Sequence, residues 1–254
     1  MKIFDSHFHI IDKNFPLINL NNYLPPVFTV NDYLEKTQGL EIVAGALVAG
    51  SFQGFEKDYM LSALNELGDN FVGTIQIPAT EPDEKIVEMD KAGIRGVRFN
   101  INAGGSEKLD NIEKLANRVF ELCGWHVELH INSSEIKDLY TLLSGLPSLS
   151  IDHLGYTKSG FDTLLRLAEN GVKIKASGFG RVEMDVKTAL TEINSVNPNS
   201  LMFGTDLPST RAPRPFQNED LNLILESFDT DECKKILFEN AEEFYNPSAK
   251  SFSD

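Results

Sequence analysis

The feature that most constrains the fold is a regular alternation of short apolar runs with amphipathic segments. The runs are rich in β-branched residues and almost continuously apolar, as expected of strands buried on both faces of a parallel sheet. The segments between them place apolar residues at i, i+3, i+4 and i+7, with a Gly near the end, and this pattern predicts helices. Eight such runs occur, at residues 2–6, 41–50, 71–78, 94–101, 125–131, 149–155, 172–178 and 200–206.

Eight strand–helix units within 254 residues are typical of a (β/α)8 barrel. We therefore predict an α/β fold with a single TIM-barrel domain over residues 1–254, with some distortion allowed. A doubly wound sheet is the alternative, but no GxGxxG motif lies in the first strand–helix turn. Residues 12–30 are rich in Pro and Asn, and they predict a long irregular loop after the first strand.

Charge and cysteine content exclude several classes of protein. The formal net charge is −15 at pH 7, whereas a nucleic-acid surface needs clustered Lys and Arg. No apolar stretch approaches the roughly 20 residues of a membrane span. Cys123 and Cys233 lie far apart and give no support to a disulfide framework. We expect a soluble cytoplasmic protein that acts on a small molecule, with no nucleic acid or membrane partner; a homo-oligomer is compatible with the sequence.

Polar side chains gather where the predicted strands end. In a barrel of this kind, chemistry takes place at the carboxyl ends of the strands. Candidate residues lie at or near the ends of six runs: His7 and His9, Arg98, His130, His153, Lys175 and Arg181, and Asp206. Since all strands of the barrel point the same way, we expect these side chains to meet at one mouth.

The pair His7 and His9 suggests a metal site, because alternation along a strand points both rings to the same face. Two such histidines can hold one divalent ion together with a third His and a carboxylate, and imidazole nitrogen suits zinc. We predict His130 and Asp206 as the remaining ligands. The alternative for each histidine alone is an ordinary hydrogen bond in the core. His126 lies nearer the other end of the barrel, and we assign it to packing.

The remaining charged candidates have two interpretations each. A buried Arg98 must meet a carboxylate, which belongs either to the substrate or to the protein. Asp5 and Asp152 are expected to make structural hydrogen bonds. In the segment "GTDLP", Gly204 permits close approach of the backbone next to Asp206.

The motifs "DSHFHI", "GVRFN", "GWHVELH", "IDHLG", "IKASG" and "FGTDLP", in this order, resemble the amidohydrolase-related TIM-barrel hydrolases (amidohydrolase 2). The closer resemblance is to their lactonase branch, which includes 2-pyrone-4,6-dicarboxylate lactonase and sugar lactonases. It implies hydrolysis of a lactone or related cyclic ester, with Asp206 as general base and His153 polarising the carbonyl. Metal use varies within this branch, so the resemblance leaves open whether one divalent ion is bound.

The same resemblance implies that Arg98 and Arg181 hold a carboxylate of an anionic substrate. A further arginine is expected shortly after "GVRFN", but the chain reads "INAGGSEK" at 101–108. This departure speaks against the pyrone dicarboxylate as substrate.

Two reaction classes fit the candidate residues. In the first, a metal-dependent type of hydrolase opens a lactone, and Asp206 activates the attacking water molecule. The oxyanion is stabilised by His153, by Lys175 or by the ion, and His130 also contacts the substrate. The alternative is a zinc-dependent non-oxidative decarboxylase of an unsaturated carboxylic acid. Such enzymes resemble "HPWD" after the fifth strand, where this chain reads "HINSS". A binding protein that keeps the fold is a third interpretation.

Overall fold

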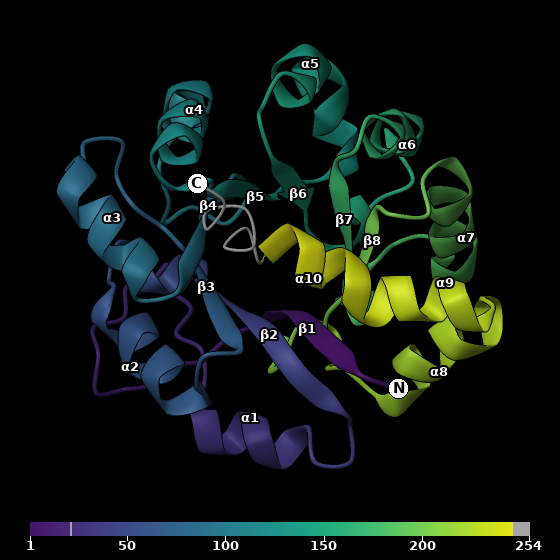
Figure 1. The fold of residues 1–254 in the computed structure, drawn as a ribbon, viewed down its shortest axis with the longest axis horizontal. Helices are drawn as coiled ribbons and strands as arrows, with labels where there is room; N and C mark the ends of the chain where they lie inside the picture. Colours follow the sequence, from purple (N-terminus) through teal and green to yellow (C-terminus); the bar gives the residue numbers. More distant parts are fainter. Residues whose placement is uncertain (21, 246–254) are drawn as a thin grey trace, which may run out of the picture.

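The computed structural model describes residues 1–20 and 22–245, and within them eight parallel strands form one sheet in chain order (Figure 1). The strands are β1 (Ile3–Phe8), β2 (Ile42–Val48), β3 (Phe71–Ile75), β4 (Ile94–Asn100), β5 (His126–His130), β6 (Leu149–Ile151), β7 (Lys173–Ala176) and β8 (Leu201–Phe203). Each overlaps one of the eight apolar runs. The predicted (β/α)8 TIM barrel is confirmed.

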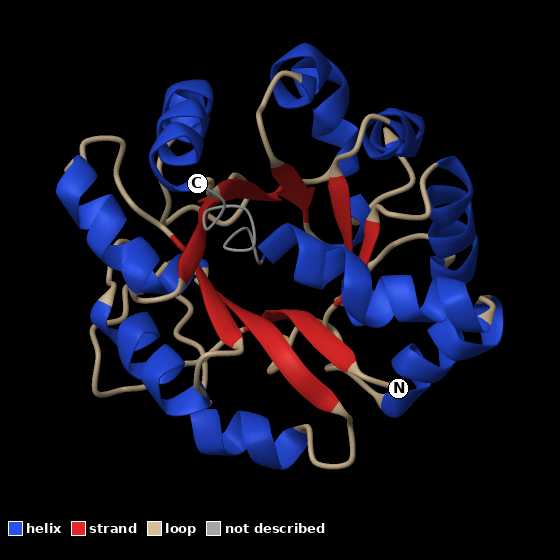
Figure 2. Ribbon diagram, in the orientation of Figure 1, coloured by secondary structure: helices blue, strands red, loops and turns tan. Residues whose placement is uncertain are grey.

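Helices surround the strands as an outer ring (Figure 2). They are α1 (Val30–Lys36), α2 (Asp58–Leu67), α3 (Asp83–Lys91), α4 (Ile112–Cys123), α5 (Ser133–Ser144), α6 (Phe161–Glu169), α7 (Val186–Val196), α8 (Asn218–Ser227), α9 (Thr230–Lys234) and α10 (Asn240–Tyr245). A π-helical turn, η5 (Lys235–Glu239), joins α9 to α10. Among the helices of the described residues, none is long and apolar enough to cross a lipid bilayer.

Helix α4 illustrates how the sequence pattern produces the outer ring. Its buried residues Ile112, Leu115, Ala116 and Val119 follow the i, i+3, i+4, i+7 spacing, so one stripe packs against the strands. The helix ends at Gly124, whose φ of 71° is the left-handed conformation that glycine adopts without a steric penalty.

The two ends of the sheet meet at the mouth of the barrel. The Asp206 amide donates to the His7 carbonyl at 2.7 Å, and the His9 amide donates to the Leu207 carbonyl at 2.8 Å. Gly204 makes this approach possible, because a Cβ there would lie 2.8 Å from the Cβ of His7. The closure therefore brings His7 of β1, and His9 just after it, beside the aspartate that follows β8.

Helix α10 crosses the opposite end of the barrel in Figure 1. Its residue Tyr245 is fully buried, stacks on Phe4 at the start of β1 and meets His126 edge to face, with ring centroids 5.4 and 5.0 Å apart. His126 thus packs at the amino-terminal end of the strands, as predicted.

The long first loop is also confirmed. No regular helix or strand lies in the described residues between β1 and α1, where an isolated antiparallel bridge joins Ile11 to Phe28. This loop returns across the mouth of the barrel and contributes Tyr23 to the cavity described next.

Candidate active site

A cavity of about 380 Å³ opens at the carboxyl ends of the strands. Its volume lies within the range of small-molecule sites. Six of the eight predicted site residues line it: His9, Arg98, His130, His153, Arg181 and Asp206. The other two, His7 and Lys175, are fully buried deeper in the barrel.

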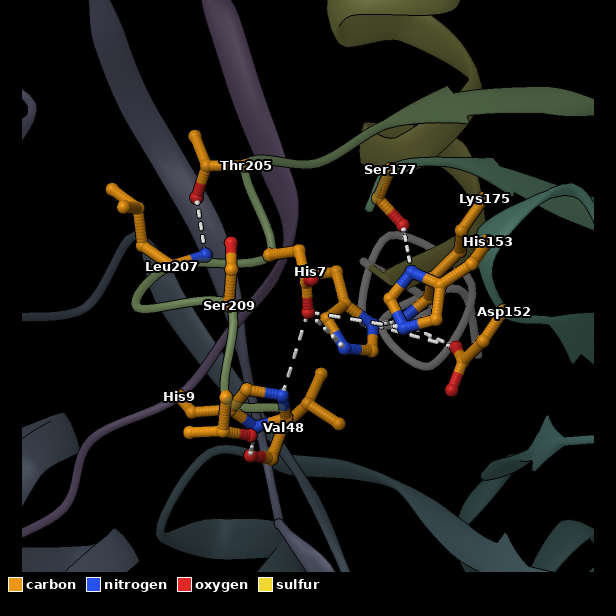
Figure 3. A network of polar contacts seen from close by, with 12 residues as sticks. His7, His9, Val48, Asp152, His153, Lys175, Ser177, Thr205, Leu207 and Ser209 are labelled. Carbon is orange, nitrogen blue, oxygen red and sulfur yellow. Dashed lines mark hydrogen bonds and ion pairs between the residues drawn. The ribbon is translucent and has the colours of Figure 1, made fainter. Parts of the chain in front are cut away.

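Three imidazole rings converge on one oxygen of Asp206. The Nε2 atoms of His7, His9 and His153 each lie 3.8 Å from Asp206 Oδ1. Figure 3 shows His7 between His9 on one side and His153, Lys175 and Asp152 on the other. Within the described part of the chain, Asp206 Oδ1 and His7 Nε2 are buried and have no hydrogen-bond partner. Polar atoms left in this state call for a ligand, an ion or a water molecule.

The hydrogen bonds of two rings fix which nitrogen faces the aspartate. His9 Nδ1 lies 2.7 Å from the Val48 carbonyl, to which it can only donate, so His9 Nε2 carries a lone pair. His7 Nδ1 faces the buried ions instead, 3.3 Å from Asp152, 3.4 Å from Glu128 and 3.2 Å from the Lys175 ammonium, so its Nε2 is the nitrogen that faces Asp206. Burial lowers the pKa of His9 well below the usual histidine range, and so keeps this ring neutral at pH 7.

These donors fit a divalent metal ion. His7, His9 and Asp206 each offer one ligand atom, and the three atoms lie within 4.8 Å of one another. Two imidazole nitrogens and a carboxylate oxygen that face one another are a donor set that suits a divalent cation.

The fourth predicted ligand, His130, lies outside this group of close donor atoms, and its role as a metal ligand stays a prediction. The structure groups His7, Asp152 and His153 as a second set of close donor atoms, and His130 is in neither. Its ring is directed toward Tyr156 instead, with centroids 5.2 Å apart, and burial lowers the pKa of His130 to about 4. His130 is therefore a neutral ring in the cavity wall.

Arg181 holds the other oxygen of Asp206. Its Nε and one terminal nitrogen donate to Asp206 Oδ2 at 3.0 and 2.7 Å. This pairing orients the carboxylate and leaves Oδ1 facing the three histidines. Burial nevertheless raises the pKa of Asp206 by more than Arg181 lowers it. The residue is thus a buried carboxylate with one free oxygen and an increased affinity for a proton.

A second group of charges, here called the buried ionic layer, lies deeper in the barrel and consists of Arg98, Glu128, Asp152 and Lys175. Arg98 donates to Asp152 at 2.6 Å, and Lys175 lies 2.5 Å from Glu128. Although burial disfavours its charge, Arg98 and the neighbouring cations hold the pKa of Asp152 well below the usual range. The layer therefore contains two compensated ion pairs.

The buried ionic layer changes the roles predicted for two residues. Arg98 meets its carboxylate in the protein, at Asp152, although it still lines the cavity. Lys175 is fully buried, is bound to Glu128 and does not line the cavity, so the structure gives no support to its predicted contact with substrate. Asp5 makes the structural hydrogen bonds expected of it, accepting from the amide and hydroxyl of Thr205 at 2.8 and 2.7 Å.

Sequence reasoning did not identify Tyr156, which shares the cavity wall with His130 and His153. The residues from His153 to Tyr156 all have positive φ, between 51° and 71°, and so form a left-handed turn. Each non-glycine residue there costs on the order of 1–2 kcal/mol. The turn brings the Tyr156 ring to 5.2 Å from that of His153, and the Tyr156 hydroxyl is buried without a partner among the described residues. Strain of this kind is typical of functional sites.

Sequence reasoning also missed Arg211, which lies in the loop between β8 and α8. This side chain is exposed and lines the cavity, together with Tyr23 from the loop after β1. The only sequence signal was a pair of arginines in the stretch "STRAPR" that follows "GTDLP".

Comparisons with known proteins agree with this geometry. The chain is 26% identical to a 4-sulfomuconolactone hydrolase of Rhizobium radiobacter over 87% of this chain and 81% of the relative. It is 24% identical to a 2-pyrone-4,6-dicarboxylate hydrolase of Comamonas testosteroni over 59% of this chain and 51% of that protein.

A solved structure from Acinetobacter baumannii is similar over nearly its whole length. That protein is described as a probable 2-pyrone-4,6-dicarboxylic acid hydrolase with citric acid bound, and it superposes with a TM-score of 0.85 at 25% identity, over 96% of this chain and 99% of that one. The model of the amidohydrolase family matches residues 4–246. This chain is a member of the amidohydrolase family.

Proposed function

We propose that this protein hydrolyses a lactone, with Asp206 as the general base. The observation that carries the proposal is the free oxygen of Asp206, which faces three histidines at the wall of an open cavity. The names of the two relatives support it, since both denote hydrolases of cyclic esters. The decarboxylase alternative gains no support from these relatives.

The proposed reaction needs one water molecule and one proton acceptor. Asp206 Oδ1 takes a proton from the water while the water oxygen attacks the ring carbonyl carbon. The tetrahedral intermediate then collapses, the ring C–O bond breaks, and the proton held by Asp206 passes to the leaving alkoxide. The product is one open-chain hydroxy acid, whose carboxylic acid group then ionises and releases a proton to the solvent.

Neighbouring side chains would assist this transfer. Arg181 keeps the Asp206 carboxylate in position through its two hydrogen bonds to Oδ2. His153 Nδ1 lies 2.9 Å from the Ser177 hydroxyl, which can act as donor or acceptor. When the hydroxyl donates, His153 Nε2 carries the proton and can donate to the carbonyl oxygen of the substrate.

A single divalent ion, for which we propose zinc, would be held by His7, His9 and Asp206. Bound there, it would supply Lewis acidity and make the deprotonation of water easier. Elemental analysis of purified protein tests this part. We expect about one equivalent of metal, and much less in a His7→Ala/His9→Ala variant.

We further propose that the enzyme acts in the cytoplasm on a small anionic substrate. Cys123 and Cys233 are both free thiols, which supports a reducing compartment.

The test of the proposed function is a panel of aldonolactones and muconolactones, with acid release followed at constant pH. We expect turnover by the wild type and a loss of about 10²- to 10⁴-fold in kcat/KM for Asp206→Asn. The exposed Asp138 on α5 provides the matched control, since Asp138→Asn should leave kcat/KM unchanged. Absence of turnover on the whole panel, or equal turnover by Asp206→Asn, contradicts the proposal.

A further inference from the structure

The cations of the cavity differ in whether the protein already neutralises them. Three arginines line the cavity: Arg98, Arg181 and Arg211. Arg98 is paired with Asp152 and Arg181 with Asp206, each through a contact shorter than 3 Å. Among the described residues, Arg211 makes no ion pair. Of these three arginines, Arg211 is therefore the one whose charge no carboxylate of the described residues balances.

Arg211 is held in place by contacts that leave its charge intact. Its guanidinium lies over the ring of Tyr23, 4.2 Å from the centroid, and donates to the Leu20 carbonyl at 3.3 Å. These contacts connect the loop after β8 to the loop after β1. A long exposed side chain loses part of its rotational freedom in this way, which reduces the entropic cost of binding an anion.

The charge of the whole protein makes this local cation more important. A net charge of −15 repels anionic molecules at long range. A substrate carboxylate that enters the cavity therefore needs a positive partner that is not already paired. Arg98 and Arg181 retain unused N–H groups, but their positive charges are balanced by carboxylates 2.6 and 2.7 Å away.

Resting on the proposed function, we infer that the substrate is a lactone with a single anionic group, and that Arg211 binds this group at the mouth of the cavity. One uncompensated cation matches one carboxylate. A second carboxylate would meet no other unpaired arginine in the described cavity lining, where side chains such as Asn100 and Asn102 are neutral. Arg211 is thus the residue that sets the preferred charge of the substrate.

A series of lactones built on one five-membered ring tests the inference. γ-Valerolactone is neutral, 5-oxotetrahydrofuran-2-carboxylate carries one negative charge, and 5-oxotetrahydrofuran-2,3-dicarboxylate carries two. We expect the wild type to have its highest kcat/KM for the monoanion, by about tenfold or more over the other two. In Arg211→Met the ratio of kcat/KM for the monoanion to that for the neutral lactone should fall about 10- to 100-fold.

Two further variants sharpen this experiment. Arg211→Lys keeps the charge and should retain part of the preference. Arg166 lies over the ring of Tyr140 at the same 4.2 Å, away from the cavity lining, so Arg166→Met removes an equivalent stacking contact and should leave the ratio unchanged. A wild-type preference for the dianion overturns the inference, as does a ratio in Arg211→Met equal to that of the wild type.

Binding of an unreactive ring separates this inference from the proposed function. Tetrahydrofuran-2-carboxylate has no lactone carbonyl, so its affinity, measured by calorimetry, does not depend on turnover. We expect binding to the wild type and at least tenfold weaker binding to Arg211→Met. If no lactone is hydrolysed but this difference is found, the hydrolase proposal fails and Arg211 remains an anion-binding residue. Equal affinity for both proteins overturns the role of Arg211.

Discussion

The buried ionic layer and the cavity above it contain similar side chains, which form close ion pairs in the layer and leave polar atoms free at the cavity wall. In the layer, Lys175 and Glu128 form one close pair, and Arg98 and Asp152 form the other. In the cavity, Asp206 keeps one oxygen without a partner and Tyr156 keeps its hydroxyl unpaired among the described residues. The comparison teaches that a charged residue at a strand end is not by itself a catalytic candidate. Glu128 Oε1 and Asp152 Oδ1 of the layer also lack a hydrogen-bond partner among the described residues, but neither residue lines the cavity. A free atom on a residue of the cavity wall is what makes that residue a candidate.

His7 connects the two regions. Its Nδ1 faces Glu128, Asp152 and Lys175 of the layer, at 3.4, 3.3 and 3.2 Å, while its Nε2 faces Asp206. The layer can thus hold the orientation of a ring whose opposite nitrogen belongs to the site. Buried charges that would otherwise cost stability acquire a positioning role in this arrangement.

The largest expected effect comes from breaking the layer at Lys175. Lys175→Met leaves Glu128 buried without its cation, and we expect the free energy of unfolding to fall by about 3–5 kcal/mol. Chemical denaturation measures this change in the free energy of unfolding. The double variant Lys175→Met/Glu128→Leu removes both charges and should regain most of the loss. If the double variant is as unstable as the single one, the pair is not the source of the effect.

The pH dependence of activity tests the state of Asp206. Burial raises the pKa of this carboxyl above its usual value, and a general base must be ionised to work. The rate should therefore fall as the pH drops through the raised pKa, about tenfold per unit, and this decline should begin above the ordinary aspartate range near 3.9. The profile of kcat/KM against pH, corrected for spontaneous hydrolysis, shows the pH at which this decline begins. A profile that stays flat down to about pH 4 would refute the assignment.

The smallest expected effect is that of Tyr156→Phe. The change removes one buried hydroxyl that has no partner in the described part of the chain, on a residue that lines the cavity. Because a neutral hydrogen bond to substrate is worth about 0.5–1.5 kcal/mol, kcat/KM should fall about 2- to 10-fold. The unfolding free energy should stay the same or rise slightly. Lower stability with unchanged kcat/KM would assign the hydroxyl to the structure instead.

The sequence was sufficient to predict the barrel, and three of its four predicted metal ligands, His7, His9 and Asp206, lie close together. Periodicity located all eight strands, and strand direction brought His7, His9, His153 and Asp206 together. The sequence alone could not identify the partner of Arg98, because a carboxylate from the protein and one from a substrate satisfy a buried guanidinium equally well.

Tyr156 and Arg211 escaped prediction for a different reason. The left-handed turn that directs Tyr156 into the cavity uses His153 and Leu154 at positive φ, a conformation that these residue types rarely adopt. Arg211 stands out only because its neighbours in space, Tyr23 and Leu20, leave its charge unpaired. Both facts depend on loop paths that no periodic pattern encodes.

The most direct test compares Asp206→Asn with Asp152→Asn at pH 7, measuring kcat/KM of each protein as purified and the free energy of unfolding of each in its metal-free form. The pKa of Asp206 is raised in the folded state, so the charge on Asp206 destabilises the fold at a pH above that pKa. The pKa of Asp152 is lowered, so the charge on Asp152 stabilises the fold above about pH 4. We predict that Asp206→Asn loses lactone hydrolysis and is at least as stable as the wild type, while Asp152→Asn loses about 3 kcal/mol or more. An Asp206→Asn protein that keeps its activity, or that is destabilised as much as Asp152→Asn, would contradict the account.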